Sequence, residues 1–177
     1  IVALSALENN VIDTKFKVKC TGKIELYGQT FHCWKEKGHG WVSLKNAMKQ
    51  SCDTYFYEVA RLLGVDRLNI TAEKFGLGKK VLDQYFDNEK KGLFPNTKWK
   101  KNNLSKGWVL GETLITGIGQ GYIQSTPLQL CMMTAQIANG GYAIKPKIIV
   151  DSNPISYEDA KQSMESGLLF DSDSESL

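Results

Sequence analysis

The strongest constraint on folding in this sequence is a helix start at Thr126. The stretch Thr126-Pro127-Leu128-Gln129 combines a capping box with a proline at the first helical position, where proline removes no helical hydrogen bond. Apolar residues follow at helical spacing, and Gly140 supplies a stop. The pattern predicts a helix over 126–139 whose buried stripe consists of Leu128, Cys131, Met132 and Ala135.

Most of the remaining patterns also favour helices. Helical spacing of apolar residues and capping signals predict further helices at 1–10, 43–49, 53–63 and 66–75. Short alternating runs between residues 13 and 40 predict two or three small strands, and "YAIKPKIIV" at 142–150 predicts another. The expected fold class is therefore mainly α, with a few short strands.

Two stretches lack any clear period. Residues 77–111 are expected to form a long surface excursion, because they contain scattered Asn and Lys residues and little apolar patterning. Residues 151–177 are acidic and rich in serine, so they are expected to form a flexible insertion or tail. This divides the chain into a domain over 1–150 and a tail over 151–177.

The charge of the chain excludes a nucleic-acid partner. The net charge is only +3, and the lysine cluster at 98–106 is explained by a solvated loop. No run approaches the roughly 20 apolar residues that a membrane span needs. The sequence starts with Ile1 in an apolar, helical stretch, so we expect it to be a segment of a longer protein.

The glycine run "GIGQG" at 117–121 is not a nucleotide-binding fingerprint. That motif requires a preceding strand, a different glycine spacing and a βαβ unit, none of which the sequence supports. A tight turn that allows close backbone packing before the helix at 126–139 explains the glycines.

The three residues Ser51-Cys52-Asp53 stand at the entry to the helix predicted at 53–63. Ser51 or Asp53 could serve merely as an N-cap, which stabilises a helix by about 1 kcal/mol. Alternatively, the three side chains belong to an active site. The motif by itself leaves both interpretations open.

Two longer blocks, "GHGWVSLKNAMKQSCDTYFY" and "GIGQGYIQSTPLQL", resemble the transpeptidase domain of class B penicillin-binding proteins, most closely the penicillin-binding protein 2 subgroup of the elongation machinery. The resemblance runs from Ile1 to about Val150. It implies the helical part of a β-lactamase/transpeptidase-like domain, whose complete form is α+β.

The resemblance also implies roles for Ser51 and Asp53. Such enzymes use Ser-x-x-Lys, Ser-x-Asn and Lys-Thr/Ser-Gly motifs, and Ser51-Cys52-Asp53 matches the second. The resemblance makes Ser51 a proton relay and Asp53 a contact to substrate or to the catalytic lysine. Asp53 stands where the general pattern has Asn, which puts an amide-donor role in doubt. The other two motifs do not occur in the sequence, so the segment is expected to carry one wall of an active site and to be inactive alone.

From the same resemblance we expect a serine-type D,D-transpeptidase of peptidoglycan synthesis that binds stem peptides and β-lactams. Its expected location is the bacterial inner membrane with this domain facing the periplasm, and its expected partner is a membrane glycosyltransferase. Two alternatives remain open, a non-catalytic zinc-stabilised binding module and a β-lactam sensor domain.

Four further side chains have the chemistry of a metal site. Cys20, Cys33, His39 and Cys52 follow the spacing C-x12-C-x5-H-x12-C, and three thiols with an imidazole form a complete ligand set for structural zinc. A Cys20–Cys33 disulfide and unlinked buried thiols are the competing interpretations. His32 is a possible substitute ligand, and Cys131 is expected to be simply buried.

Overall fold

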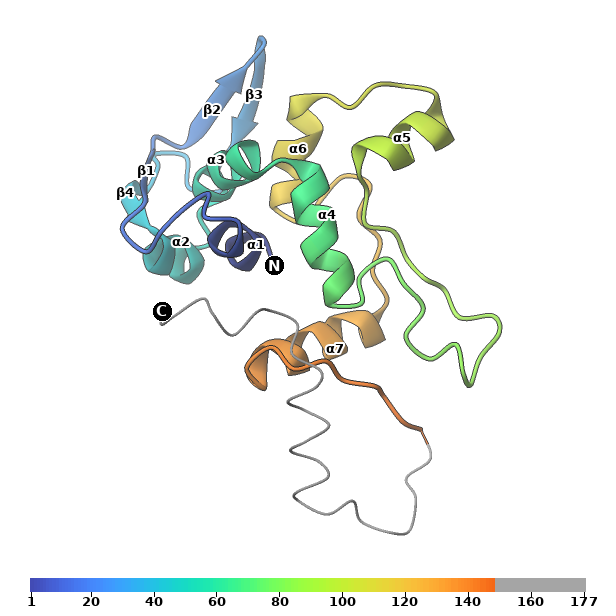
Figure 1. Ribbon diagram of the computed structural model, residues 1–177. Coiled ribbons are helices and arrows are strands. Elements are labelled where there is room, and N and C mark those ends of the chain that lie inside the picture. Colours follow the sequence, from blue (N-terminus) through green and yellow to red (C-terminus); the bar gives the residue numbers. More distant parts are fainter. Residues whose placement is uncertain (149–177) are drawn as a thin grey trace. The chain divides into compact units, whose positions relative to one another are not determined.

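Seven helices and four short strands form along residues 1–148, the part of the chain that the computed structural model describes (Figure 1). The helices are α1 (Val2–Glu8), α2 (Leu44–Gln50), α3 (Asp53–Leu63), α4 (Val65–Lys74), α5 (Thr97–Leu104), α6 (Leu110–Gly117) and α7 (Pro127–Ala138). The strands are β1 (Lys17–Cys20), β2 (Lys23–Leu26), β3 (Gln29–His32) and β4 (Gly40–Ser43). The mainly α prediction is confirmed.

The described chain divides into two compact units. One unit consists of residues 1–71 and 95–123, and the other of residues 72–94 and 124–148. The chain thus leaves the first unit after residue 71, returns to it at residue 95 and enters the second unit again at residue 124. No helix among residues 1–148 is both long enough and apolar enough to cross a membrane.

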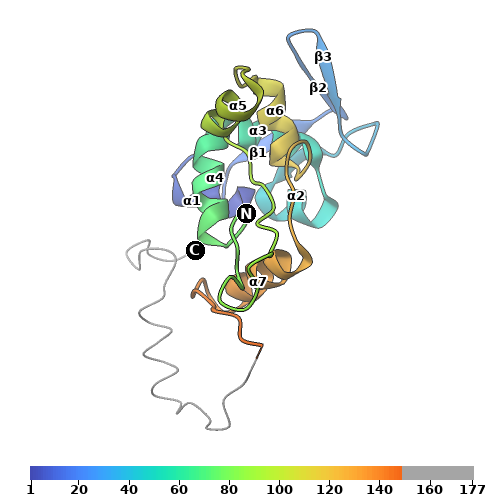
Figure 2. The same cartoon turned by 90° about the vertical axis from the view of Figure 1, so that its right-hand side faces the viewer.

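Helix α3 is the centre of the first unit. Its buried residues recur at helical spacing, so most of the helix is covered, and Tyr55, Val59 and Ala60 are completely buried. Helices α1 and α6 and strand β1 pack against it (Figures 1 and 2). A hydrogen bond of 2.8 Å from Thr71 Oγ1 to Ser5 Oγ ties α4 to α1 in the same core.

The close packing of α6 on α3 depends on Gly117. A Cβ atom at this position would lie 2.4 Å from the Cβ of Ala60 and 3.1 Å from the carbonyl oxygen of Phe56. Neither of these atoms belongs to a flexible side chain end, so the helices would have to separate. The first glycine of "GIGQG" therefore has the packing role that the sequence predicted.

Gly117→Ala is expected to lower the free energy of unfolding by about 1–3 kcal/mol, because the added methyl group overpacks the α3–α6 contact. Urea unfolding followed by circular dichroism measures the change. Gly107→Ala is the matched control, since nothing lies within 4 Å of a Cβ at Gly107. Equal stability of the two variants would show that α3 and α6 do not pack as described.

The four strands form two separate antiparallel pairs, β1 with β4 and β2 with β3. The β2–β3 hairpin is closed by Tyr27 and Gly28, which have φ values of 49° and 78°. Two central residues with positive φ fit the type I′ turn whose twist matches that of paired strands. The hairpin projects away from the helices of its unit, and the β1–β4 pair leads directly into α2 (Figure 1).

A buried ion pair joins α5 to α6. Lys100 Nζ lies 2.5 Å from Glu112 Oε1, and the two side chains are 6% and 18% exposed. Glu112 also accepts hydrogen bonds from the Tyr122 hydroxyl and from the backbone N–H of Val109. Burial opposes the ionised form of Glu112, but these donors and the Lys100 ammonium outweigh it and lower the pKa of the carboxyl.

In the second unit, α7 begins as predicted but buries a different stripe. Thr126 and Gln129 form the capping box, with bonds of 2.9 and 3.2 Å between side chain and backbone. The buried residues of α7 are Gln129, Met132 and Gln136. The prediction that Cys131 is buried is wrong, since this thiol is exposed.

The two glutamines are buried because they supply hydrogen bonds to chain that has no regular structure. Gln129 Nε2 donates to the carbonyl oxygens of Lys79 and Lys91 at 2.6 and 2.8 Å. Gln136 Nε2 donates to the carbonyl oxygen of Phe75, and its Oε1 accepts from Ile144 N. Satisfied in this way, an amide can be buried at little net cost.

Two other predictions need correction. Residues 77–111 are not one irregular excursion, since α5 lies within them and α6 starts at Leu110. Over 142–148 the described chain forms no strand, and only Tyr142 takes part in a β-bridge. Residues 149 and 150 of that predicted strand, and the tail predicted over 151–177, lie outside the described residues.

Candidate metal centre and active-site wall

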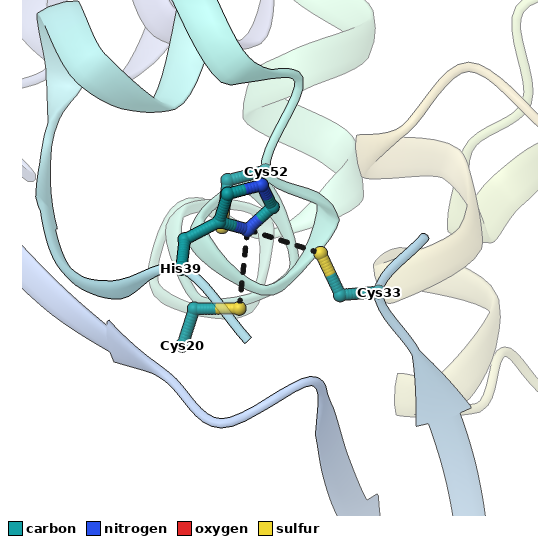
Figure 3. Close-up of side chains that lie close together, drawn as sticks. All are labelled: Cys20, Cys33, His39 and Cys52. Carbon is teal, nitrogen blue, oxygen red and sulfur yellow. Dashed lines mark hydrogen bonds between the residues drawn. The ribbon is translucent and has the colours of Figure 1, made fainter. Parts of the chain in front are cut away.

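Cys20, Cys33, His39 and Cys52 converge in the first unit (Figure 3). Their four potential ligand atoms all lie within 4.8 Å of one another. Each comes from a different segment: the end of β1, the residue after β3, the loop before β4, and the turn between α2 and α3. The three thiols are buried, and all four cysteines of the chain, including Cys131, are free thiols.

The two nitrogen–sulfur distances in this cluster match the corresponding edges of a zinc tetrahedron. His39 Nδ1 lies 3.5 Å from Cys20 Sγ and 3.6 Å from Cys33 Sγ. Zinc bonds of about 2.3 Å to sulfur and about 2.0 Å to nitrogen place these atoms about 3.5 Å apart at a tetrahedral angle. The donor set and its spacing therefore fit zinc, with Nδ1 as the imidazole ligand.

Two glycines allow the ligand-bearing loops to approach so closely. A Cβ at Gly22 would lie 2.0 Å from the carbonyl oxygen of Glu36, and one at Gly38 would lie 2.2 Å from the carbonyl oxygen of Cys20. Both glycines also have positive φ values, 96° and 74°. Because only glycine combines this conformation with this contact, the loops that carry Cys20 and His39 are locked together by their backbones.

The thiols of the cluster differ sharply in acidity. Burial opposes ionisation of Cys20, but hydrogen bonds with Thr54 and His39 outweigh it and lower the pKa of this thiol to about 6. Burial, together with the neighbouring Cys20 and Cys33, raises the pKa of Cys52 to about 12. The surroundings thus favour ionisation of Cys20 and oppose ionisation of Cys52. A divalent cation is the partner that would let all three ionise together.

The structure separates the two candidate histidines. The side chain of His32 is exposed, and its backbone carbonyl accepts a 3.1 Å hydrogen bond from the Tyr57 hydroxyl. His39 instead points Nδ1 at the thiols, and its buried Nε2 has no hydrogen-bond partner among residues 1–148. His32 does not belong to the cluster.

Ser51 lies beside this cluster on an exposed turn. It ends α2 in the left-handed conformation, with φ 50° and ψ 53°. The turn is held by hydrogen bonds from Ser51 N to Met48 O at 3.4 Å and from Cys52 N to Ala47 O at 2.9 Å. The side chain of Cys52 points into the cluster, whereas Ser51 is exposed to solvent. The two neighbouring side chains therefore lie on opposite sides of the turn.

Neither Ser51 nor Asp53 is the N-cap of α3. That position belongs to Cys52, which makes no side-chain capping bond. Asp53 is the first residue of the helix, and its Oδ2 accepts a 2.9 Å hydrogen bond from the backbone N–H of Trp34. The capping interpretation of the motif is therefore wrong.

Two contributors to this site were missed from the sequence. Trp34 contacts the turn on both sides of Ser51, and Thr54 forms a 3.4 Å hydrogen bond with Cys20 Sγ. The only indication of Thr54 in the sequence is that it directly follows Ser51-Cys52-Asp53. The only indication of Trp34 is that it follows Cys33. No local sequence pattern predicts its hydrogen bonds to Gln50 and Asp53, which are 16 and 19 positions away.

Known proteins share both the sequence and the fold. Residues 1–168 match the family described as "Penicillin binding protein transpeptidase domain". The chain is 38% identical over 150 residues to the peptidoglycan D,D-transpeptidase MrdA of Acinetobacter baumannii, covering 83% of this chain and 22% of that protein. It is 34% identical over 164 residues to MrdA of Escherichia coli K12, covering 91% of this chain and 25% of that protein.

Solved structures agree with these relatives. The crystal structure of Pseudomonas aeruginosa PBP2 in complex with WCK 5153 is 39% identical, with a TM-score of 0.78 over 94% of this chain and 41% of that one. The complex of PBP2 and MreC from Helicobacter pylori is 33% identical, with a TM-score of 0.79 over 94% of this chain and 32% of that one. The chain thus spans about a quarter of the length of the curated relatives it matches.

Proposed function

This chain belongs to the family of penicillin-binding protein transpeptidase domains, and from that membership we propose that it forms one wall of the active site of a peptidoglycan D,D-transpeptidase. The parent enzyme cross-links stem peptides in the cell wall. The observation that carries the proposal is the exposed Ser51, which is held in a left-handed turn beside Asp53 at the position of the family's second motif.

In the proposed reaction, a nucleophilic serine supplied by a Ser-x-x-Lys motif outside this sequence attacks the D-Ala-D-Ala peptide bond. The acyl group passes to the serine and D-alanine leaves with a proton. An amine of a second stem peptide then takes the acyl group and the serine regains its proton. The Ser51 hydroxyl relays protons between the nucleophile and the leaving or entering amine. β-Lactams acylate the same nucleophile.

A zinc ion bound by Cys20, Cys33, His39 and Cys52 has a structural role in this proposal. A site with four protein ligands leaves no open position for substrate, so the ion supplies stability and does not take part in the reaction. The proposal is supported by the 3.5 and 3.6 Å spacing of sulfur and nitrogen and by the joined backbones at Gly22 and Gly38. Cys52 couples this centre to the neighbouring Ser51.

The setting of the parent enzyme is part of the proposal. It lies in the bacterial inner membrane with this domain in the periplasm, where stem peptides are joined. Its partners are stem peptides, β-lactams and a membrane glycosyltransferase of the elongation complex. Support comes from two structural relatives: the PBP2–MreC complex and, at 28% identity and a TM-score of 0.71, a peptidoglycan synthase complex described as coordinating polymerization and crosslinking.

Covalent labelling by a fluorescent penicillin tests the proposed activity. We expect the full-length protein to be labelled in a form that survives boiling, while the 177-residue chain alone stays unlabelled because it lacks the nucleophile. Ser51→Ala in the full-length protein is expected to slow labelling by about 10²–10⁴-fold, the range for loss of a positioned proton-transfer group.

Ser105→Ala is the matched control for that measurement. Ser105 is also an exposed serine that ends a helix in the left-handed conformation, with φ 52°. The two substitutions therefore perturb the backbone alike, and only Ser51→Ala should slow labelling. An unlabelled full-length protein would instead favour a non-catalytic binding module, and labelling of the isolated chain would contradict the assignment of motifs.

A further inference from the structure

Trp34 donates a hydrogen bond to one residue on each side of the exposed Ser51. Its ring N–H donates a 2.9 Å hydrogen bond to the carbonyl oxygen of Gln50, the residue before Ser51. Its backbone N–H donates a 2.9 Å hydrogen bond to the carboxylate of Asp53, two residues after Ser51. One residue thus holds the turn on both sides of Ser51.

The turn needs such support because of its backbone conformation. A residue other than glycine in the left-handed region is strained by about 1–2 kcal/mol, and the strain persists only where surrounding contacts over-determine it. Gln50 ends α2, so its carbonyl has no partner within the helix. The ring N–H of Trp34 satisfies this carbonyl and fixes the peptide plane that leads into Ser51.

The indole is not placed here for burial. Trp34 is 65% exposed, so its ring adds little to the core. Its position is fixed by the residues beside it: Cys33 is buried in the thiol cluster, and the His39 ring lies edge-on to the indole at a centroid distance of 5.3 Å. The backbone of Trp34 is therefore held in place by its neighbour Cys33, and the side chain extends from there to the turn.

We propose that Trp34 is a positioning residue for the transpeptidation reaction, which holds Ser51 in its left-handed conformation through hydrogen bonds to Gln50 and Asp53. The inference rests on the proposed function for its catalytic consequence, while its structural content stands on the two hydrogen bonds alone. It also gives Asp53 a definite task. The carboxylate accepts from Trp34, so the amide that the general motif carries at this position is not required for the turn.

Trp34→Phe in the full-length protein tests the proposal, because it removes the ring N–H and keeps an aromatic side chain. Two quantities are measured: the saturating rate of acylation by a fluorescent penicillin, and hydrogen exchange of the amides of Ser51 and Cys52. We expect acylation to slow by about 3- to 10-fold with unchanged penicillin affinity, the effect of losing one neutral hydrogen bond. Exchange at Cys52 should accelerate by a similar factor, while exchange within α3 stays unchanged.

Trp41→Phe is the matched control. Trp41 is equally exposed at 68%, lies in the neighbouring strand β4, and makes no side-chain hydrogen bond to any residue within 1–148. Asp53→Asn should keep exchange at Cys52 close to the wild-type rate, since its carbonyl oxygen still accepts from Trp34, whereas Asp53→Ala should accelerate it.

The two measurements separate the failure of this proposal from failure of the proposed function. If the wild-type protein is not acylated, the proposed function fails, and the exchange data still decide whether Trp34 holds the turn. If the wild type is acylated and Trp34→Phe matches Trp41→Phe in both measurements, Trp34 is not a positioning residue. Faster exchange throughout α3 would mean that the substitution unfolds the region, which also contradicts a local role.

Discussion

Cys52→Ala is expected to abolish zinc binding and to lower the melting temperature by about 10 °C or more. The substitution removes one of the four proposed ligands, and a structural zinc site contributes its binding free energy directly to folding. A loss of about 3 kcal/mol or more corresponds to this shift in a chain of this size, at about 2–4 °C per kcal/mol. Chelation of protein purified with its metal should produce the same shift.

Elemental analysis of protein purified without chelator provides the stoichiometry, with about one zinc expected per chain. Cys131→Ala is the control, because it removes an exposed thiol that lies outside the cluster. It should leave both the zinc content and the melting temperature unchanged. A metal-free protein that contains a Cys20–Cys33 disulfide and does not respond to chelation would show that the cysteines have been misinterpreted.

Lys100→Met is expected to lower the free energy of unfolding by about 3–5 kcal/mol, the range for removing one partner of a buried ion pair. The reason is the charge left behind: Glu112 is only 18% exposed and would keep just the Tyr122 hydroxyl and the Val109 N–H as donors. Urea unfolding measures the change, with Lys101→Met as the control on the exposed side of α5.

The double variant Lys100→Met/Glu112→Gln separates the loss of the pair from the unpaired charge. A neutral glutamine can still accept from Val109, and it leaves no ionised group without a partner. We expect the double variant to recover a large part of the lost stability. If Lys100→Met proves as stable as Lys101→Met, the ion pair does not bind α5 to α6.

Features with local signals were predictable from the sequence. Helices α3 and α7 were predicted because their signals are local: an apolar period for α3, and for α7 a capping box and a stop glycine that all lie within a few residues. The donor set of the thiol cluster was also predicted, since the chemistry of the residue types was enough to select Cys20, Cys33, His39 and Cys52.

The errors have a common physical origin in contacts between distant residues. Helix α5 was missed because its sequence, "TKWKKNNL", has almost no apolar stripe, and its one buried residue is the paired Lys100. The buried face of α7 was assigned to Cys131 because apolar residues usually take that place, whereas the irregular chain around Lys79 and Lys91 required amide donors there. Pairings of this kind leave no local pattern.

The glutamines of α7 have a consequence for how this part of the chain can change. Gln129 and Gln136 donate hydrogen bonds to main-chain carbonyl groups. These bonds do not depend on the side chains of Lys79, Lys91 or Phe75. Every residue type carries the same carbonyl, so substitutions at Lys79 or Lys91 leave the attachment intact. Replacement of Gln129 would release both attachments at once. We therefore expect many substitutions to be tolerated at Lys79 and Lys91, and few to be tolerated at Gln129 and Gln136.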